Sequence, residues 1–125
     1  MNEREARAVL FSAIEGGHPF WMSEIFSLGA LKVIEKLQGG GYEQKKFNRL
    51  ITKISTITAD QVLSRIAAAQ AEFLIPGEPL WPIRAGDLAA PPIALIVKGN
   101  LEALSMQSLA IVGTRNPTNY GARIA

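Results

Sequence analysis

The stretch that predicts the fold class is residues 110–121, which read AIVGTRNPTNYG. The stretch begins inside Leu109–Val112, a short, continuous apolar run of the kind that forms a strand covered on both faces of a parallel sheet. A polar loop with one glycine follows, and residues 120–125 have the character of a helix that is starting. Because ligands bind at the carboxyl ends of strands in open α/β sheets, this order predicts a ligand site in the loop.

Four residues of the loop suit an anionic ligand. Gly113 lets the backbone approach a phosphate closely, and Thr114 adds a hydroxyl donor. Arg115 adds a planar guanidinium that matches two phosphate oxygens, and Thr118 either caps the following helix or donates to the anion. The free N–H groups at the start of that helix also favour negative charge. We therefore predict phosphate binding here, although an ordinary strand-to-helix turn with an exposed arginine has the same pattern.

Other short elements precede the loop. The apolar run Phe73–Ile75 is closed by the turn signal Pro76-Gly77, and Ile93–Val97 predicts a second buried strand. Residues 101–106 can form a helical turn or two. We expect residues 73–125 to be the start of a parallel α/β sheet, and the chain to end before that sheet is complete.

Residues 1–72 have helical periodicity instead and are expected to form a separate compact module. Five helices are predicted: about 3–15, after Pro19, about 30–38 beyond a break at Gly29, about 43–54, and from a capping box formed by Thr58 and Gln61. The residues expected to face inward are Ala6, Val9, Leu10, Ala13, Ile14, Trp21, Ile25, Leu28, Leu31, Ile34, Leu37, Phe47, Leu50, Ile51, Ile54, Val62, Leu63, Ile66 and Ala69.

The fourth helix carries a basic face made of Lys45, Lys46, Arg49 and Lys53. We consider Lys45, Arg49 and Lys53 a possible secondary DNA contact, but the simpler interpretation is a solvated face opposite the core. Residues 18–21, which read HPFW, suit a stacking platform for bases. Burial of Trp21 in the helical core, with His18 at a helix start, is the simpler interpretation of that stretch.

Composition excludes several classes of site and protein. The 125 residues contain no cysteine and one histidine, which rules out disulfides and thiolate metal sites and leaves no histidine-based zinc site. No apolar run reaches the roughly 18 residues that span a bilayer, and the first residues lack the apolar core of a signal peptide. We expect a soluble, cytoplasmic protein with no metal and no cofactor. The net charge of +2 does not by itself indicate nucleic acid as a partner.

Residues 111–121 resemble the DprA/Smf family of DNA-processing proteins, and so do the upstream stretches PGEPLWP at 76–82 and PPIALIVKG at 91–99. In that family a turn-rich lead-in precedes a strand ending in Lys-Gly, and then a Val-Gly-Ser/Thr-Arg strand and loop. Thr114 stands where serine is common, and the lead-in around Glu78 lacks the usual Asp and Tyr-Pro. The helical residues 1–72 occupy the place of a SAM-like or helix-hairpin-helix-like module.

The resemblance implies a function and partners. Such proteins bind single-stranded DNA and help to load the recombinase RecA during natural transformation, without catalysing a reaction. Residues 73–125 would be the start of a Rossmann-like DNA-binding domain, in which Gly113, Thr114, Arg115 and Thr118 contact DNA phosphates. A homodimer is expected for the full-length protein.

Two alternatives remain open. A nucleotide-phosphate-binding enzyme of the lysine-decarboxylase-like phosphoribohydrolase type has a similar glycine-rich first loop, but its catalytic glutamate segment would have to follow residue 125. A helical protein-interaction module is the other alternative. The loop is neither a Walker loop nor the Gly-x-Gly-x-x-Gly fingerprint of dinucleotide-binding folds, because its spacing fits neither pattern.

Overall fold

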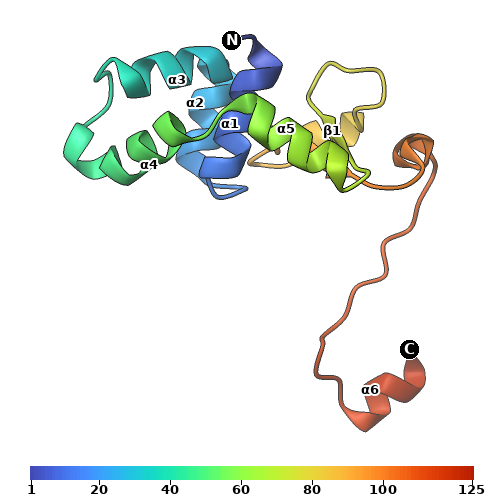
Figure 1. Cartoon of the computed structure of the whole chain (residues 1–125). Coiled ribbons are helices and arrows are strands. Elements are labelled where there is room, and N and C mark those ends of the chain that lie inside the picture. The colour runs from blue at the N-terminus through green and yellow to red at the C-terminus, as the bar shows by residue number, and fades with distance from the viewer.

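The computed structural model describes residues 1–125 and has a helical body followed by a small sheet and an extended C-terminal segment (Figure 1). The helices of the body are α1 (Glu3–Ala13), α2 (Pro19–Leu28), α3 (Ala30–Gln38), α4 (Gln44–Thr56) and α5 (Ala59–Ala68). They are followed by β1 (Glu72–Leu74), the 3-10 helix η1 (Ile83–Asp87), β2 (Leu95–Val97), the 3-10 helix η2 (Leu101–Ser105) and α6 (Asn119–Ile124). None of the helices is both long enough and apolar enough to cross a membrane.

Helix α1 is the centre of the body. A capping box starts it: the Asn2 side chain accepts from the backbone N–H of Glu5, whose carboxylate accepts from the N–H of Asn2. Its apolar face is almost fully buried, with Ala6 and Leu10 at 0% exposure. The helix contacts α3, α4 and α5, so three other helices are positioned against it.

Gly29 separates α2 from α3 and has to be glycine for two reasons. Its φ of +84° lies in the left-handed region, which side chains with a Cβ disfavour. A Cβ at this position would also meet a carboxylate oxygen of Glu3 at 3.3 Å. Glycine at this turn therefore leaves room for the side chain of Glu3 beside the start of α3.

The carboxylate of Glu3 occupies the N-terminus of α3. It accepts hydrogen bonds from the backbone N–H groups of Ala30 (2.9 Å) and Leu31 (3.2 Å), and from Nε of Arg7 (2.8 Å). Burial alone would raise the pKa of Glu3, but these hydrogen bonds and the charge of Arg7 together hold it below its ordinary value of 4.5. Glu3 thus satisfies free N–H groups of a helix that has no side-chain cap of its own.

Two arginines of α1 hold the segment that follows the helices. Arg7, with 14% of its side chain exposed, donates from Nη1 to the carbonyl of Ile93 at 2.7 Å. Arg4 donates from Nη2 to the carbonyl of Phe73 at 2.7 Å and forms an ion pair with Glu78. Because these carbonyls belong to the residues around β1 and β2, the sheet is fixed directly to the first helix.

The strands β1 and β2 pair antiparallel, with Phe73 opposite Ile96. Phe73 and Ala94 are buried with Ala8 and Ile66 in a small second core, and Ile93 is part of the main helical core. The rings of Phe11 and Phe73 meet edge to face at 5.8 Å. The first residues after the helices therefore share their cores with α1 and α5.

The five predicted helices are confirmed, as are the short elements near residues 73–75, 93–97, 101–106 and 120–125. The strand near residues 93–97 is not fully buried as predicted, since Ile96 is 48% exposed. Two predicted core residues are wrong. Leu28 is 36% exposed because it lies at the last residue of α2, where the chain turns outward, and Ala69 is exposed because it is the C-cap beyond α5. The predicted strand at Leu109–Val112 is absent, and Leu109, Ile111 and Val112 are each about 90% exposed.

The sheet also differs from the prediction, since its two strands are antiparallel. A fully covered strand requires hydrogen-bonding neighbours and packing on both faces. Residues 109–112 have neither in this chain, which explains why an apolar run there does not form a strand. The structure is helical with a small antiparallel sheet. The Rossmann-like parallel sheet, the SAM-like or helix-hairpin-helix-like module and the division at residues 72 and 73 stay predictions.

Replacing Arg7 with methionine tests the link between α1 and the sheet. The variant keeps an unbranched, apolar stem but leaves the carbonyl of Ile93 and the carboxylate of Glu3 without their Arg7 donors, so we expect Arg7→Met to lower the free energy of unfolding by about 1–3 kcal/mol. Urea unfolding followed by circular dichroism measures the change. The matched control is Arg65→Met on the exposed side of α5, and equal losses in the two variants would contradict this role for Arg7.

The lowered pKa of Glu3 predicts a pH dependence. A carboxyl group whose pKa is depressed by folding stabilises the folded state above its ordinary value of 4.5 and loses that contribution as the pH falls through the folded-state value. We expect Glu3→Gln to be less stable than the wild type near neutral pH, with the difference shrinking in acid. Urea unfolding across this pH range tests it against Glu35→Gln, an exposed control. A difference that does not change with pH would argue against the prediction.

Candidate functional site

The predicted phosphate loop lies on the exposed C-terminal segment. Gly113, Thr114, Arg115 and Thr118 are all exposed, and the segment runs away from the helical body towards α6 (Figure 1). A Cβ added to Gly113 would meet nothing within 4 Å, so the backbone there is open to a ligand. The structure therefore brings the four residues onto one short accessible stretch, while their binding of phosphate stays a prediction.

The two threonines of the loop have local backbone partners. Oγ1 of Thr114 accepts from the N–H of Asn116 at 3.2 Å, and Oγ1 of Thr118 accepts from the N–H of Gly121 at 3.1 Å as the N-cap of α6. A hydroxyl that accepts a hydrogen bond still has its own proton to donate. Both side chains can therefore order the loop and donate to an anion at the same time.

Arg115 is the free cation of the loop. It forms no ion pair, and its guanidinium makes no hydrogen bond with another residue of the chain. An unpaired guanidinium has all five donors available to phosphate oxygens. Of the three predicted residues with a polar side chain, Arg115 is the one whose side chain makes no hydrogen bond within the chain.

The basic face of α4 is also unpaired. Lys45, Lys46, Arg49 and Lys53 are exposed, and none of them takes part in an ion pair. Arg49 and Lys46 line a pocket in the helical body, whereas Lys45 and Lys53 do not. Of the three residues considered as a possible secondary DNA contact, Arg49 therefore lies at the pocket, and Lys45 and Lys53 lie on the open surface of α4.

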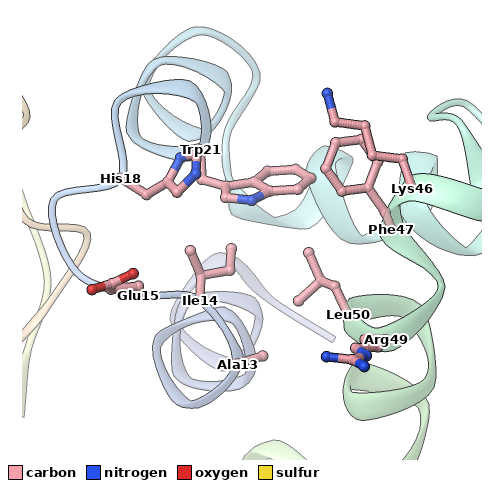
Figure 2. A pocket seen from close by; sticks show the side chains of 9 residues that line it. All are labelled: Ala13, Ile14, Glu15, His18, Trp21, Lys46, Phe47, Arg49 and Leu50. Carbon is pink, nitrogen blue, oxygen red and sulfur yellow. The ribbon is translucent and has the colours of Figure 1, made fainter.

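This pocket has a volume of about 210 Å³ and lies where the end of α1, the start of α2 and the middle of α4 meet (Figure 2). Apolar side chains form much of its wall, and basic side chains stand at its edge on the α4 side. Its lining residues are Ala13, Ile14, Glu15, His18, Trp21, Lys46, Phe47, Arg49 and Leu50.

Four aromatic rings gather beside the pocket. Trp21 and Phe47 meet at 5.1 Å, Phe20 stacks parallel to Phe47 at 6.0 Å, and Tyr42 meets Trp21 at 5.4 Å. Trp21 is only 5% exposed, which confirms its place in the core, and His18 is the N-cap of α2 as expected. The packed rings make the aromatic side of the pocket rigid.

Hydrogen bonds to Glu24 fix this aromatic cluster. The Tyr42 hydroxyl and Nζ of Lys36 both donate to the carboxylate of Glu24, and Lys36 also lies over the Tyr42 ring at 4.4 Å. The hydrogen bond from Tyr42 is the main reason that the pKa of Glu24 is lowered. Burial, followed by the hydrogen bond and charge of Glu24, raises the pKa of Tyr42 above its ordinary value of 10.0.

Sequence reasoning placed Phe47 in the core but missed the role of Tyr42 and the position of Lys46 at a pocket. The available signal was the concentration of aromatic residues at 20–21 and 42–47, on either side of the turn at 39–41.

A second pocket, of about 470 Å³, lies beside β1, but its Arg4 and Glu78 are already paired with each other. No group of histidine, cysteine, aspartate or glutamate side chains is arranged to hold a metal ion.

Comparison with known proteins bears on the C-terminal half. Residues 72–125 match the family model of DNA recombination-mediator protein A. Through this segment the chain is similar to the DprA/Smf family. The matched residues include β1, β2 and the whole loop from Gly113 to Thr118.

A curated DprA/Smf relative extends the similarity into the helices. Protein Smf of Synechocystis is 26% identical over 107 residues, which is 82% of this chain. The chain spans about a quarter of that relative's length, since the match covers 25% of it. No solved structure matches the chain. Neither of the two matches favours the phosphoribohydrolase alternative.

The effect of Glu24 on the pKa of Tyr42 tests how the aromatic cluster is held. We expect Glu24→Gln to lower the pKa of Tyr42, because a neighbouring negative charge no longer opposes its ionisation, but to leave it above 10.0, because the ring stays buried. Ultraviolet absorbance titration measures this in a Tyr120→Phe background, where Tyr42 is the remaining tyrosine. Glu35→Gln is the control, and an unchanged titration in Glu24→Gln would contradict the assigned hydrogen bond.

Proposed function

We propose that this chain belongs to a protein that binds single-stranded DNA and helps to load the recombinase RecA onto it during natural transformation. The family match from residue 72 to residue 125 supports this role, because it assigns the loop and the strands before it to a recombination-mediator family. The role requires no cofactor and no chemical step on the DNA. The proposed partners are single-stranded DNA, RecA and, in the full-length gene product, a second copy of the protein.

The main support for the proposal is that the guanidinium of Arg115 has no partner within the chain. It is exposed and unpaired, and it lies between Gly113, which leaves open space at the backbone, and Thr118, which caps a helix. A guanidinium placed before a helix N-terminus is suited to a phosphate group. We infer that Gly113, Thr114, Arg115 and Thr118 hold a phosphate of the DNA backbone.

A phosphate contact predicts binding without sequence preference. Phosphate oxygens are the same at every nucleotide, so contacts to them supply affinity and position but do not read the bases. A protein that coats or transfers DNA strands of any sequence needs this property. The loop contains no aromatic residue between Gly113 and Thr118, which fits recognition of the backbone.

The test is Arg115→Ala in the full-length gene product. Loss of a charge-assisted hydrogen bond of roughly 1.5–3 kcal/mol should weaken binding to single-stranded DNA by about ten- to a hundredfold. Arg115→Lys should restore only part of the affinity, because a point charge lacks the bidentate fork. Fluorescence anisotropy with labelled oligonucleotides of different base composition, at fixed salt, measures the losses, which should be similar for all sequences.

Two variants complete this experiment. Gly113→Val should weaken binding without unfolding the protein, because a Cβ there meets nothing in the chain but a larger side chain blocks the approach of a phosphate. Arg84→Ala in η1 removes an exposed arginine elsewhere and should leave the affinity unchanged. The loop is not a phosphate site if Arg115→Ala binds single-stranded DNA as tightly as the wild type.

A further inference from the structure

The pocket between α1, α2 and α4 combines three features that the predicted phosphate loop does not explain. It is concave and small, its walls are apolar, and its edge is cationic (Figure 2). Ile14 and Leu50 face the space from opposite sides, with the indole of Trp21 and the ring of Phe47 above them. A concave surface with apolar walls of this kind suits a flat apolar group.

The size of the pocket limits what it holds. Pockets for drug-sized ligands have volumes of roughly 300–1,000 Å³, whereas this one has about 210 Å³. A single aromatic ring system, such as one nucleobase, is the kind of group that suits the smaller space. Trp21 and Phe47 meet edge to face at an interplanar angle of 66°, and both line this space.

The charges around the pocket indicate that the ligand is an anion. Lys46 and Arg49 stand on α4 at the edge of the pocket and have no acidic partner, and Glu15 is the one acidic residue in the lining. Lys45 and Lys53 extend the positive surface along the same helix. Apolar and aromatic walls beside unpaired cations are the combination by which proteins bind single-stranded nucleic acid, with bases stacked and phosphates neutralised.

We propose that this pocket holds one base of a single-stranded nucleic acid, and that Lys46 and Arg49 bind the phosphates next to that base. The inference rests on the proposed function, since it assigns a second contact for the same strand. It places that contact in the helical body, apart from the loop around Arg115 (Figure 1). This proposal replaces the solvated-face interpretation for Lys46 and Arg49, while Lys45 and Lys53 keep that interpretation.

The first experiment fills the pocket without changing its charge. Ala13 is the last residue of α1 and lines the space, so Ala13→Leu adds apolar atoms inside it and preserves the helix. With the 125-residue chain and a labelled single-stranded oligothymidylate, we expect affinity to fall on the order of tenfold, the loss of one stacked base. Circular dichroism confirms that the variant is folded.

The second experiment removes the cations at the edge. Lys46→Ala combined with Arg49→Ala should weaken binding and reduce the slope of log affinity against log salt by about 0.7 for each lost phosphate contact. The matched control is Lys32→Ala combined with Arg65→Ala, which removes one lysine and one arginine from exposed positions outside the pocket and without ion pairs. That control should bind as the wild type does.

A spectroscopic measurement locates the base. The chain has two tryptophans, so in a Trp81→Phe background the emission reports Trp21 alone. Saturating oligothymidylate should quench this emission, and Ala13→Leu should prevent the quenching. Unchanged Trp21 emission, or wild-type affinity in a folded Ala13→Leu variant, overturns the inference, as does an equal effect of the two double variants.

The outcomes separate this inference from the proposed loop site. If Arg115→Ala weakens binding of the same oligonucleotide while the pocket variants do not, the loop site stands and the pocket inference fails. If the pocket variants weaken binding while Arg115→Ala has no effect in the full-length gene product, the pocket binds the strand and the loop assignment fails. A 125-residue chain that does not bind the oligonucleotide overturns the pocket inference, whereas the loop is judged on the full-length gene product.

Discussion

The charged side of α1 is the constraint on which the rest of the body depends. Glu3 caps α3, Arg7 joins Glu3 to the carbonyl of Ile93, and Arg4 holds the carbonyl of Phe73. These groups are partly buried, and an unpaired polar group at such a position costs stability that a few apolar contacts do not replace. One turn of one helix therefore fixes both the packing of α3 and the attachment of the sheet.

The candidate pocket is a consequence of the same arrangement. Helix α1 ends at Ala13, and the chain returns through His18 to start α2, so the last residues of α1 remain beside Trp21. Helix α4 closes the third side with Phe47, whose ring is held among aromatic neighbours. Because the walls come from three helices that pack on one core, the shape of the pocket is as rigid as the core itself.

The sequence predicted the helices well because their signals are local. The capping box of Thr58 and Gln61 and the break at Gly29 depend on a few adjacent residues, and the structure has both. The pairing of β1 with β2 and the exposure of Ile111 depend on partners elsewhere in the chain, which periodicity does not reveal. The loop around Arg115 was predicted as a site from its chemistry, whereas the pocket required the meeting of residues 13–21 with 46–50, far apart in the sequence.

The attachment of the sheet to α1 has a consequence for biosynthesis. The ribosome adds Ile93 86 residues after its partner Arg7, and it adds Phe73 69 residues after Arg4. At about 5–20 residues per second, Arg7 remains without this partner for roughly 4–17 s on the ribosome. During that interval the nascent helices can form, so the sheet joins α1 only after residue 93 has been made.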